Sequence, residues 1–121
     1  TTHPKGDTMS VVQNREAVKA ENVHGGNGYI LRDVLLQDNQ LNGICTFAAC
    51  ITLEPGCEIG PHVHAEDTEM YFLIEGNALY NDNGEETEVH VGDVMFCEKG
   101  DSHAIKNHTD SPAKFVALIQ K

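Results

Sequence analysis

The chain has 121 residues, of which 40% are hydrophobic and 22% are charged, and its formal net charge is −11 at pH 7. This length and composition are those of one globular domain with a buried core. The negative charge argues against a surface that binds nucleic acid or anionic lipid. No apolar run approaches the ~20 residues of a membrane helix, and no signal-peptide pattern is visible. We therefore expect a cytoplasmic protein with no nucleic-acid or membrane partner.

The N-terminal residues precede any regular strand pattern. We expect residues 1–8 to be a disordered lead-in or a remnant of cloning, with Met9 as the native start. The expected organisation is a lead-in over residues 1–22 and a single domain over residues 23–121. Within the lead-in, Asn14 is placed to cap one helical turn over residues 15–18.

From residue 29 onward the chain is a series of predicted strands. Runs of β-branched and aromatic residues recur about every 8 to 12 residues and are separated by glycine, proline and Asn/Asp turns. The segment 81–84, Asn-Asp-Asn-Gly, is the strongest hairpin signal. No long helical pattern is present, so an all-β sandwich or barrel is favoured. The predicted strands cover residues 29–36, 44–53, 62–64, 69–75, 77–80, 87–91, 94–97, 103–107 and 115–119.

A glycine-bounded stretch carries the first candidate ligands. It runs from Gly56 through five residues to His62-x-His64, then through four residues to Glu69 and six more to Gly76. Because side chains alternate along a strand, His62 and His64 project from one face. Two imidazoles and a carboxylate in one concavity are suitable ligands for a divalent metal. The alternative is a pair of surface histidines beside a solvated acid.

A second stretch, like the first, contains regularly placed glycines, and it carries one more histidine. Gly92, Glu98, Gly100, His103 and Asn107 follow one another at spacings of five, one, two and three residues. Together the two stretches resemble the two signature motifs of the cupin superfamily. One position departs from the family pattern, because Glu98 stands where a proline is usual, and it falls in a loop rather than on a ligand. The segment between the motifs, residues 77–91, fits the shortest spacing of small microbial cupins.

The resemblance implies a fold and a site. The fold would be all-β, the cupin double-stranded β-helix or jelly-roll barrel. The metal ligands would be His62, His64, Glu69 and His103, and they would hold one divalent transition-metal ion per chain. Mn, Fe, Ni, Zn and Cu all suit this set of ligands, so the sequence does not choose among them. Two coordination positions would stay open for a small anionic or oxygen-chelating metabolite.

Two functions are compatible with such a site. The first is a metalloenzyme that acts on a small organic acid or a sugar-derived metabolite by decarboxylation, isomerisation, lyase chemistry or oxygenation. The second is a non-catalytic module that binds or senses a metabolite through its metal. The chain is similar to small cupins related to the oxalate decarboxylase group. That group has two domains and a lid with a proton-transferring glutamate, and we identify no such lid here.

The candidate catalytic residues are Tyr71 and His24. Tyr71 shares the strand face of Glu69 and would therefore point into the barrel. For His24 the favoured interpretation is a surface histidine, and the alternative is that the glycine-rich turn after it brings it near the barrel mouth. Around His103, the same alternation predicts that Asn107 supports a turn or lies behind the ligands. His90 and His108 are expected at the surface.

Strand alternation also leaves an apolar stripe on the opposite face of residues 69–75. Met70, Phe72 and Ile74 would face outward, where exposure of apolar area to water is unfavourable. With the apolar strand 115–119, this stripe predicts a two-fold homodimer. The four cysteines are expected to be reduced and mostly buried, and a redox role for Cys57 is an alternative.

Overall fold

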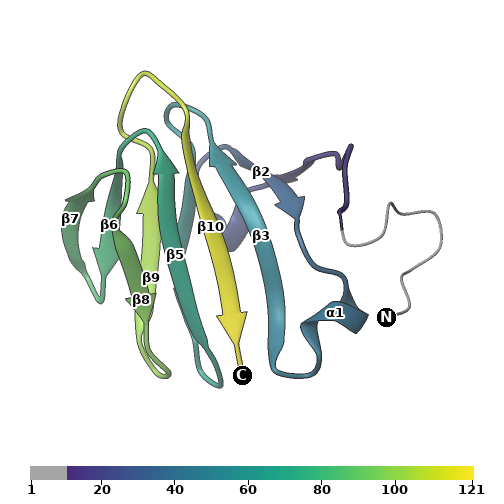
Figure 1. Ribbon diagram of the computed structural model, residues 1–121. Coiled ribbons are helices and arrows are strands. Elements are labelled where there is room, and N and C mark those ends of the chain that lie inside the picture. The colour runs from purple at the N-terminus through teal and green to yellow at the C-terminus, as the bar shows by residue number, and fades with distance from the viewer. Residues whose placement is uncertain (1–10) are drawn as a thin grey trace.

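A computed structural model describes residues 11–121, so the expectations for residues 1–8 and for Met9 lie outside the described residues. Two antiparallel sheets make up the molecule (Figure 1). The larger has the order β1-β2-β3-β10-β5-β8 and the smaller the order β4-β9-β6-β7. This arrangement is the predicted all-β jelly roll. The strands are β1 (Val18–Glu21), β2 (Tyr29–Val34), β3 (Cys45–Leu53), β4 (Glu58–Val63), β5 (Thr68–Glu75), β6 (Ala78–Asp82), β7 (Glu85–Val89), β8 (Val94–Cys97), β9 (Ser102–Lys106) and β10 (Ala113–Gln120).

The predicted helical turn over residues 15–18 is wrong. Asn14 has a φ of 60°, which is the left-handed region rather than a helix cap, and Val18 begins β1. This strand pairs with β2, and its Ala20 packs against the core. The domain boundary at residue 23 stays a prediction. β1 lies before that boundary, but hydrogen bonds join it to the larger sheet.

A short helix, α1 (Asp38–Leu41), stands where the sequence predicts only a break between strands. At its start the backbone N–H of Gln37 donates to the side-chain oxygen of Gln40, and Leu41 within it is buried. Such a single turn has no periodicity that a sequence pattern could reveal. Among residues 11–121, no helix is long and apolar enough to cross a membrane.

The core lies between the two sheets and is formed by alternate residues of their strands. On β5, Glu69, Tyr71 and Leu73 are buried, whereas Phe72 and Ile74 are 38% and 41% exposed. The predicted alternation along this strand is therefore confirmed. The same alternation on β10 buries Phe115 and Ala117, which the sequence analysis assigned to the outer apolar surface.

Candidate metal centre

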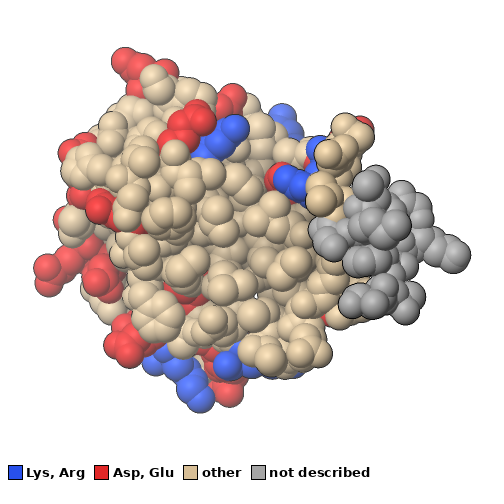
Figure 2. All heavy atoms as spheres, viewed as in Figure 1, with Lys and Arg blue, Asp and Glu red and all other residues tan. Residues whose placement is uncertain are grey.

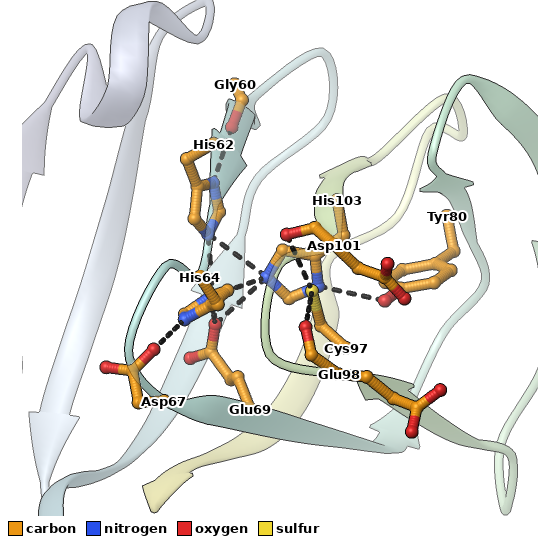
Figure 3. Close-up of polar contacts among 10 residues, drawn as sticks. All are labelled: Gly60, His62, His64, Asp67, Glu69, Tyr80, Cys97, Glu98, Asp101 and His103. Atoms are coloured by element: carbon orange, nitrogen blue, oxygen red, sulfur yellow. Dashed lines mark hydrogen bonds and ion pairs between the residues drawn. The ribbon is translucent and has the colours of Figure 1, made fainter. Parts of the chain in front are cut away.

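The four predicted metal ligands meet at one end of the space between the sheets. The β4–β9 pairing places His62 directly opposite His103, and Glu69 is the second residue of β5. His64 lies just beyond β4, where its backbone exchanges hydrogen bonds with Asp101 and Gly100 in the loop before β9. Figure 3 shows the three imidazoles and the carboxylate pointing toward a common centre.

Distances between the ligand atoms are short and similar. The Nε2 atom of His103 lies 3.0 Å from that of His62 and 3.1 Å from that of His64. Oε1 of Glu69 lies 3.0 Å from the Nε2 atom of His103, 2.9 Å from that of His64 and 3.8 Å from that of His62. All four ligand atoms lie within 4.8 Å of one another. Adjacent ligands about 2.1 Å from an ion in octahedral geometry are themselves about 3.0 Å apart.

The contacts of each Nδ1 atom determine whether the Nε2 atom of the same imidazole carries a proton or a lone pair. Nδ1 of His62 contacts the carbonyl oxygen of Gly60 at 2.8 Å, and Nδ1 of His64 contacts a carboxylate oxygen of Asp67 at 2.7 Å. Both partners only accept, so each Nδ1 donates its proton and each neutral ring presents the lone pair of Nε2 to the centre. Nδ1 of His103 contacts the hydroxyl of Tyr80 at 2.9 Å.

Converging lone pairs and a carboxylate repel one another unless a cation lies between them. The residues present therefore fit a divalent metal ion, and the carbonyl or carboxylate behind each imidazole is the usual means of orienting a metal-bound histidine. Asp67 and Tyr80 are supporting residues that the sequence analysis missed. The position of Asp67, three residues after His64, is the one signal that could have identified it.

The protonation of the metal-free site is consistent with this fit. Burial raises the pKa of the Glu69 carboxyl, but its contacts with His103 and His62 outweigh burial and hold that pKa at about 2. Burial lowers the pKa of His103. Burial acts on His62 in the same direction, but Glu69 and the Gly60 carbonyl raise its pKa above the ordinary value. Without a cation, the charge of Glu69 therefore favours a proton on His62, and a metal ion would displace that proton.

Tyr71 lies inside the barrel, as predicted. Its ring stacks on that of His103 with centroids 4.8 Å apart and planes 18° apart, and its side chain is buried. Burial and the charge of Glu69 raise the pKa of its hydroxyl well above the usual value. Tyr71 is therefore a protonated phenol that lines the same cavity as the ligands.

His24 lies at the barrel mouth, against the metal ligands. Its ring stacks on that of His62, with centroids 4.0 Å apart and planes 12° apart. It belongs to the single-turn 3-10 helix η1 (Val23–Gly25). That turn packs closely on β4, because a Cβ atom on Gly60 would clash with the carbonyl oxygen of His24, and one on Gly26 would clash with that of Glu58. The glycine-rich turn thus brings His24 close to the site by close backbone approach.

A cavity of about 490 Å³ is lined by three of the four ligands, His62, His64 and Glu69. Its walls include apolar side chains from both sheets, among them Ile51 and Ile59, and it is also lined by Arg32 of β2. Arg32 is not among the residues predicted from the sequence. Strand alternation from Ile30, which is buried, could have placed it on the inner face.

The remaining predicted residues lie away from the ligands. Asn107 is fully buried and supports a turn, because its amide donates to Leu53 and Ser111 and accepts from Thr109. His90 and His108 lie at the surface beside Glu88. In the described chain all of the cysteines are free, with Cys57 and Cys97 buried and the other two part-buried.

Known proteins resemble this chain over most of its length. A family model described as Cupin domain matches residues 49–119. A Thermotoga maritima protein named oxalate-binding protein is 31% identical over 117 residues, which cover 95% of this chain and 97% of that protein. The crystal structure of a predicted oxalate decarboxylase from Thermotoga maritima is similar with a TM-score of 0.88 and 29% identity, over 91% of this chain and 97% of that one. A conserved protein from Klebsiella pneumoniae with a double-stranded β-helix domain is similar with a TM-score of 0.68 and 28% identity, over 81% and 82% of the two chains.

Proposed function

This chain belongs to the cupin family, and from that premise we propose that it is a metalloenzyme that acts on a small organic acid or a sugar-derived metabolite. One divalent transition-metal ion would be held by His62, His64, Glu69 and His103. The substrate would be anionic and would chelate the ion through adjacent oxygens. Mn, Fe, Ni, Zn and Cu remain equal candidates, because imidazole and carboxylate ligands suit all of them.

The observation that carries this proposal is the convergence of ligand atoms beside an open cavity. Three of the ligands are buried, with His103 only 1% exposed, and His62 is part-buried. The cavity beside them reaches the surface through residues such as His24 and Glu66. A purely structural metal site has no need of such a cavity. A bound ion would polarise a carboxylate or carbonyl oxygen that reaches its open positions.

The chain's own groups would divide the remaining work. Glu69 is the one charged ligand, so it offsets part of the ion's charge and limits how strongly bound oxygens are acidified. Tyr71 would donate a hydrogen bond toward the cavity, since its raised pKa keeps the phenol protonated. His24 would accept or return a proton at the mouth, because burial and the neighbouring His62 lower its pKa and keep its imidazole neutral.

A second candidate function is binding without chemistry. The relative named oxalate-binding protein supports it, since that printed name describes binding rather than turnover. It is supported too by the burial of Tyr71, which is 2% exposed and has little freedom to move toward a substrate. In this case the metal site would sense or store a metabolite.

A ligand screen followed by turnover assays separates the two functions. Metal-loaded protein is tested by thermal shift against 2-oxo acids, 2-hydroxy acids, oxalate and uronates, and each stabilising ligand is then assayed for turnover with each metal and with oxygen present. We expect at least one ligand to stabilise the fold and to be consumed. Tight binding without turnover would exclude the enzyme and support the binding function. If no anion stabilised the protein, both functions would be contradicted.

Three variants sharpen the enzyme proposal. Glu69→Gln keeps the shape and an oxygen ligand but removes the negative charge. An enzyme should then lose turnover by orders of magnitude, whereas a binder should hold an anion as well as or better than wild type. His24→Phe and Tyr71→Phe preserve the stacked rings, and for each we expect unchanged metal content and a turnover lowered about 10²-fold or more. Unchanged turnover would remove that residue from the mechanism.

We also propose that the protein is a homodimer formed through the outer face of the larger sheet. Exposed apolar side chains gather there on the neighbouring strands β5 and β8, and charged side chains lie mainly at the rim of this side (Figure 2). The most exposed are Phe72 at 38%, Ile74 at 41%, Val94 at 61% and Phe96 at 52%. Light scattering should report twice the chain mass of 13.2 kDa. Phe96→Asp should give a monomer, and a monomeric wild type would contradict the dimer.

The remaining expectations on partners and compartment are proposals as well. The net charge of −11 supports a protein with no nucleic-acid or anionic-membrane partner. The free cysteines of the described chain are consistent with a reducing, cytoplasmic environment. A nitrocellulose filter assay with DNA and RNA, and fractionation of cells that express the protein, would test these two points.

A further inference from the structure

Arg32 is the feature of the cavity that the metal site does not explain. It lies on β2 two residues after Ile30, which is 3% exposed, so both side chains share the inner face of the larger sheet. Across the sheet it is paired in register with Ile51, which is 2% exposed and also lines the cavity. A part-buried guanidinium against apolar walls is unfavourable unless its donors and its charge find a partner.

The protein itself supplies Arg32 with no acidic partner among residues 11–121. No carboxylate in that part of the chain lies within the 4.0 Å of an ion pair. The adjacent acid, Asp33, faces the other side of β2 and is held by Arg15, with a distance of 2.9 Å from its carboxylate to Nε. Of the acids that line the cavity, Asp67 contacts His64 and Glu69 contacts the imidazoles. The third, Glu66, is exposed at the mouth and forms no ion pair with Arg32. Arg32 is therefore available to an anion that enters from solvent.

The size of the cavity indicates a ligand larger than the smallest chelators. Its volume of about 490 Å³ lies in the range of pockets that bury most of a drug-sized molecule. Apolar side chains such as Phe47, Ile51 and Ile119 line it beside Arg32. A carbon chain would pack against these walls, while a planar carboxylate at its far end would match the fork of the guanidinium.

We propose that the site takes a dicarboxylate, with an oxygen-chelating head at the metal ligands and a second carboxylate bound by Arg32. This inference rests on the proposed function, because the head group requires the metal. It adds that Arg32 determines specificity, and that an acid with a second, distal carboxylate is preferred over the matched acid without one. The ligand class is then that of 2-oxo or 2-hydroxy diacids, rather than uncharged sugars or simple monocarboxylates.

The test compares pairs of ligands that differ in the distal group. Titration calorimetry on the metal-loaded wild type measures binding of 2-oxoglutarate against 2-oxopentanoate, which have the same carbon number and the same head. Oxaloacetate against 2-oxobutanoate, and 2-oxoadipate against 2-oxohexanoate, vary the chain length. A charge-assisted hydrogen bond predicts that the diacid of at least one pair binds about 10- to 100-fold more tightly.

Variants assign that preference to a residue. Arg32→Gln should remove it while leaving the affinity for the monoacid and the metal content unchanged, and Arg32→Lys should keep part of it through charge alone. Arg15→Gln is the matched control, because Arg15 faces away from the cavity, and it should behave as wild type. The inference would be overturned if Arg32→Gln still preferred the diacid, or if wild type preferred the diacid in none of the ligand pairs. Normal metal content in these experiments would leave the metal site itself supported. Loss of metal binding in wild type would instead overturn the proposed function, and this inference with it.

Discussion

The protein contains two groups of histidine and glutamate side chains with similar contact distances and different surroundings. In the first, Oε1 of Glu69 lies 2.9 Å and 3.0 Å from the Nε2 atoms of His64 and His103. In the second, Glu88 lies 3.2 Å and 2.9 Å from the Nε2 atoms of His90 and His108. We call these the inner group and the outer group. The inner group also contains His62.

The groups differ in convergence and in burial. In the inner group one carboxylate oxygen serves all of the imidazoles, and the imidazole nitrogens also approach one another. In the outer group each imidazole contacts a different oxygen of Glu88, and the His90 side chain is 59% exposed. Close contact alone thus makes a solvated ion pair, whereas convergence on one point inside the protein makes a cation site. Substitutions in the two groups should therefore differ in their effects on metal binding and stability.

The largest difference is expected when one histidine is removed from each group. His103→Ala should lose most of its metal, because a ligand and its buried position are both removed. An ion at 100 times its Kd stabilises the fold by about 2.7 kcal/mol, so the thermal midpoint of metal-loaded protein should fall by roughly 10 °C. His108→Ala should keep full metal content. Calorimetry and elemental analysis of both variants measure these effects. Equal metal loss in His103→Ala and His108→Ala would contradict the distinction between the inner and outer groups.

A smaller difference is expected when the residue behind an imidazole is changed. Asp67→Asn weakens the orientation of His64, whose Nδ1 lies 2.7 Å from the carboxylate, and such changes typically weaken metal binding about 10- to 100-fold. Glu88→Gln, which changes the carboxylate beside His108, should not alter metal affinity. Competition with a chromophoric chelator gives both affinities. Unchanged affinity in Asp67→Asn would show that His64 needs no support.

The acid response of the metal-free protein distinguishes the two carboxylates. The Glu69 pKa of about 2 in the folded state is below its ordinary value of 4.5. Its stabilising contribution is therefore present above pH 4.5 and is lost as pH falls toward 2. Between pH 7 and pH 3 wild type should lose about 2 kcal/mol more unfolding free energy than Glu69→Gln.

Glu88→Gln provides the control for that experiment. The histidine contacts also lower the pKa of Glu88, but solvent screens an exposed pair. This variant should therefore follow the wild-type pH profile in urea unfolding at each pH. A Glu69→Gln profile parallel to that of wild type would contradict the assigned pKa.

The smallest effect is expected for the outer group alone. His108→Ala should shift the thermal midpoint of the protein by less than about 2 °C. Because exposed charges are screened, any shift should vanish in 1 M NaCl. A larger shift that persists in high salt would mean that the outer group has a structural role that its exposure does not suggest.

The inner group was predictable from sequence because each ligand lies on or next to a strand in a fixed register. Spacing placed His62, His64 and Glu69 together, and the family resemblance added His103. The supports were harder to predict, since Tyr80 depends on how β6 packs against β9. His24 could be placed only as an alternative, because close backbone approach at Gly60 decides its position and no periodicity encodes that contact.

Other parts of the fold escaped prediction for local reasons. The predicted helical turn after Asn14 is wrong because tertiary pairing of β1 with β2 overrides a weak local preference. Arg32 was missed although its strand was predicted, since alternation was applied to β5 and not to β2. Alternation was not applied to β10 either, so the whole strand was assigned to the outer apolar surface although Phe115 and Ala117 point into the core.

Anomalous diffraction from a crystal of the metal-loaded protein tests the central claim most directly. Data collected at the absorption edge of the loaded metal should give one strong peak per chain, located among the Nε2 atoms of His62, His64 and His103 and the carboxylate of Glu69. A peak beside His90, Glu88 and His108 in its place, or no peak at the inner group after exposure to Mn, Fe, Ni, Cu and Zn in turn, would contradict the account.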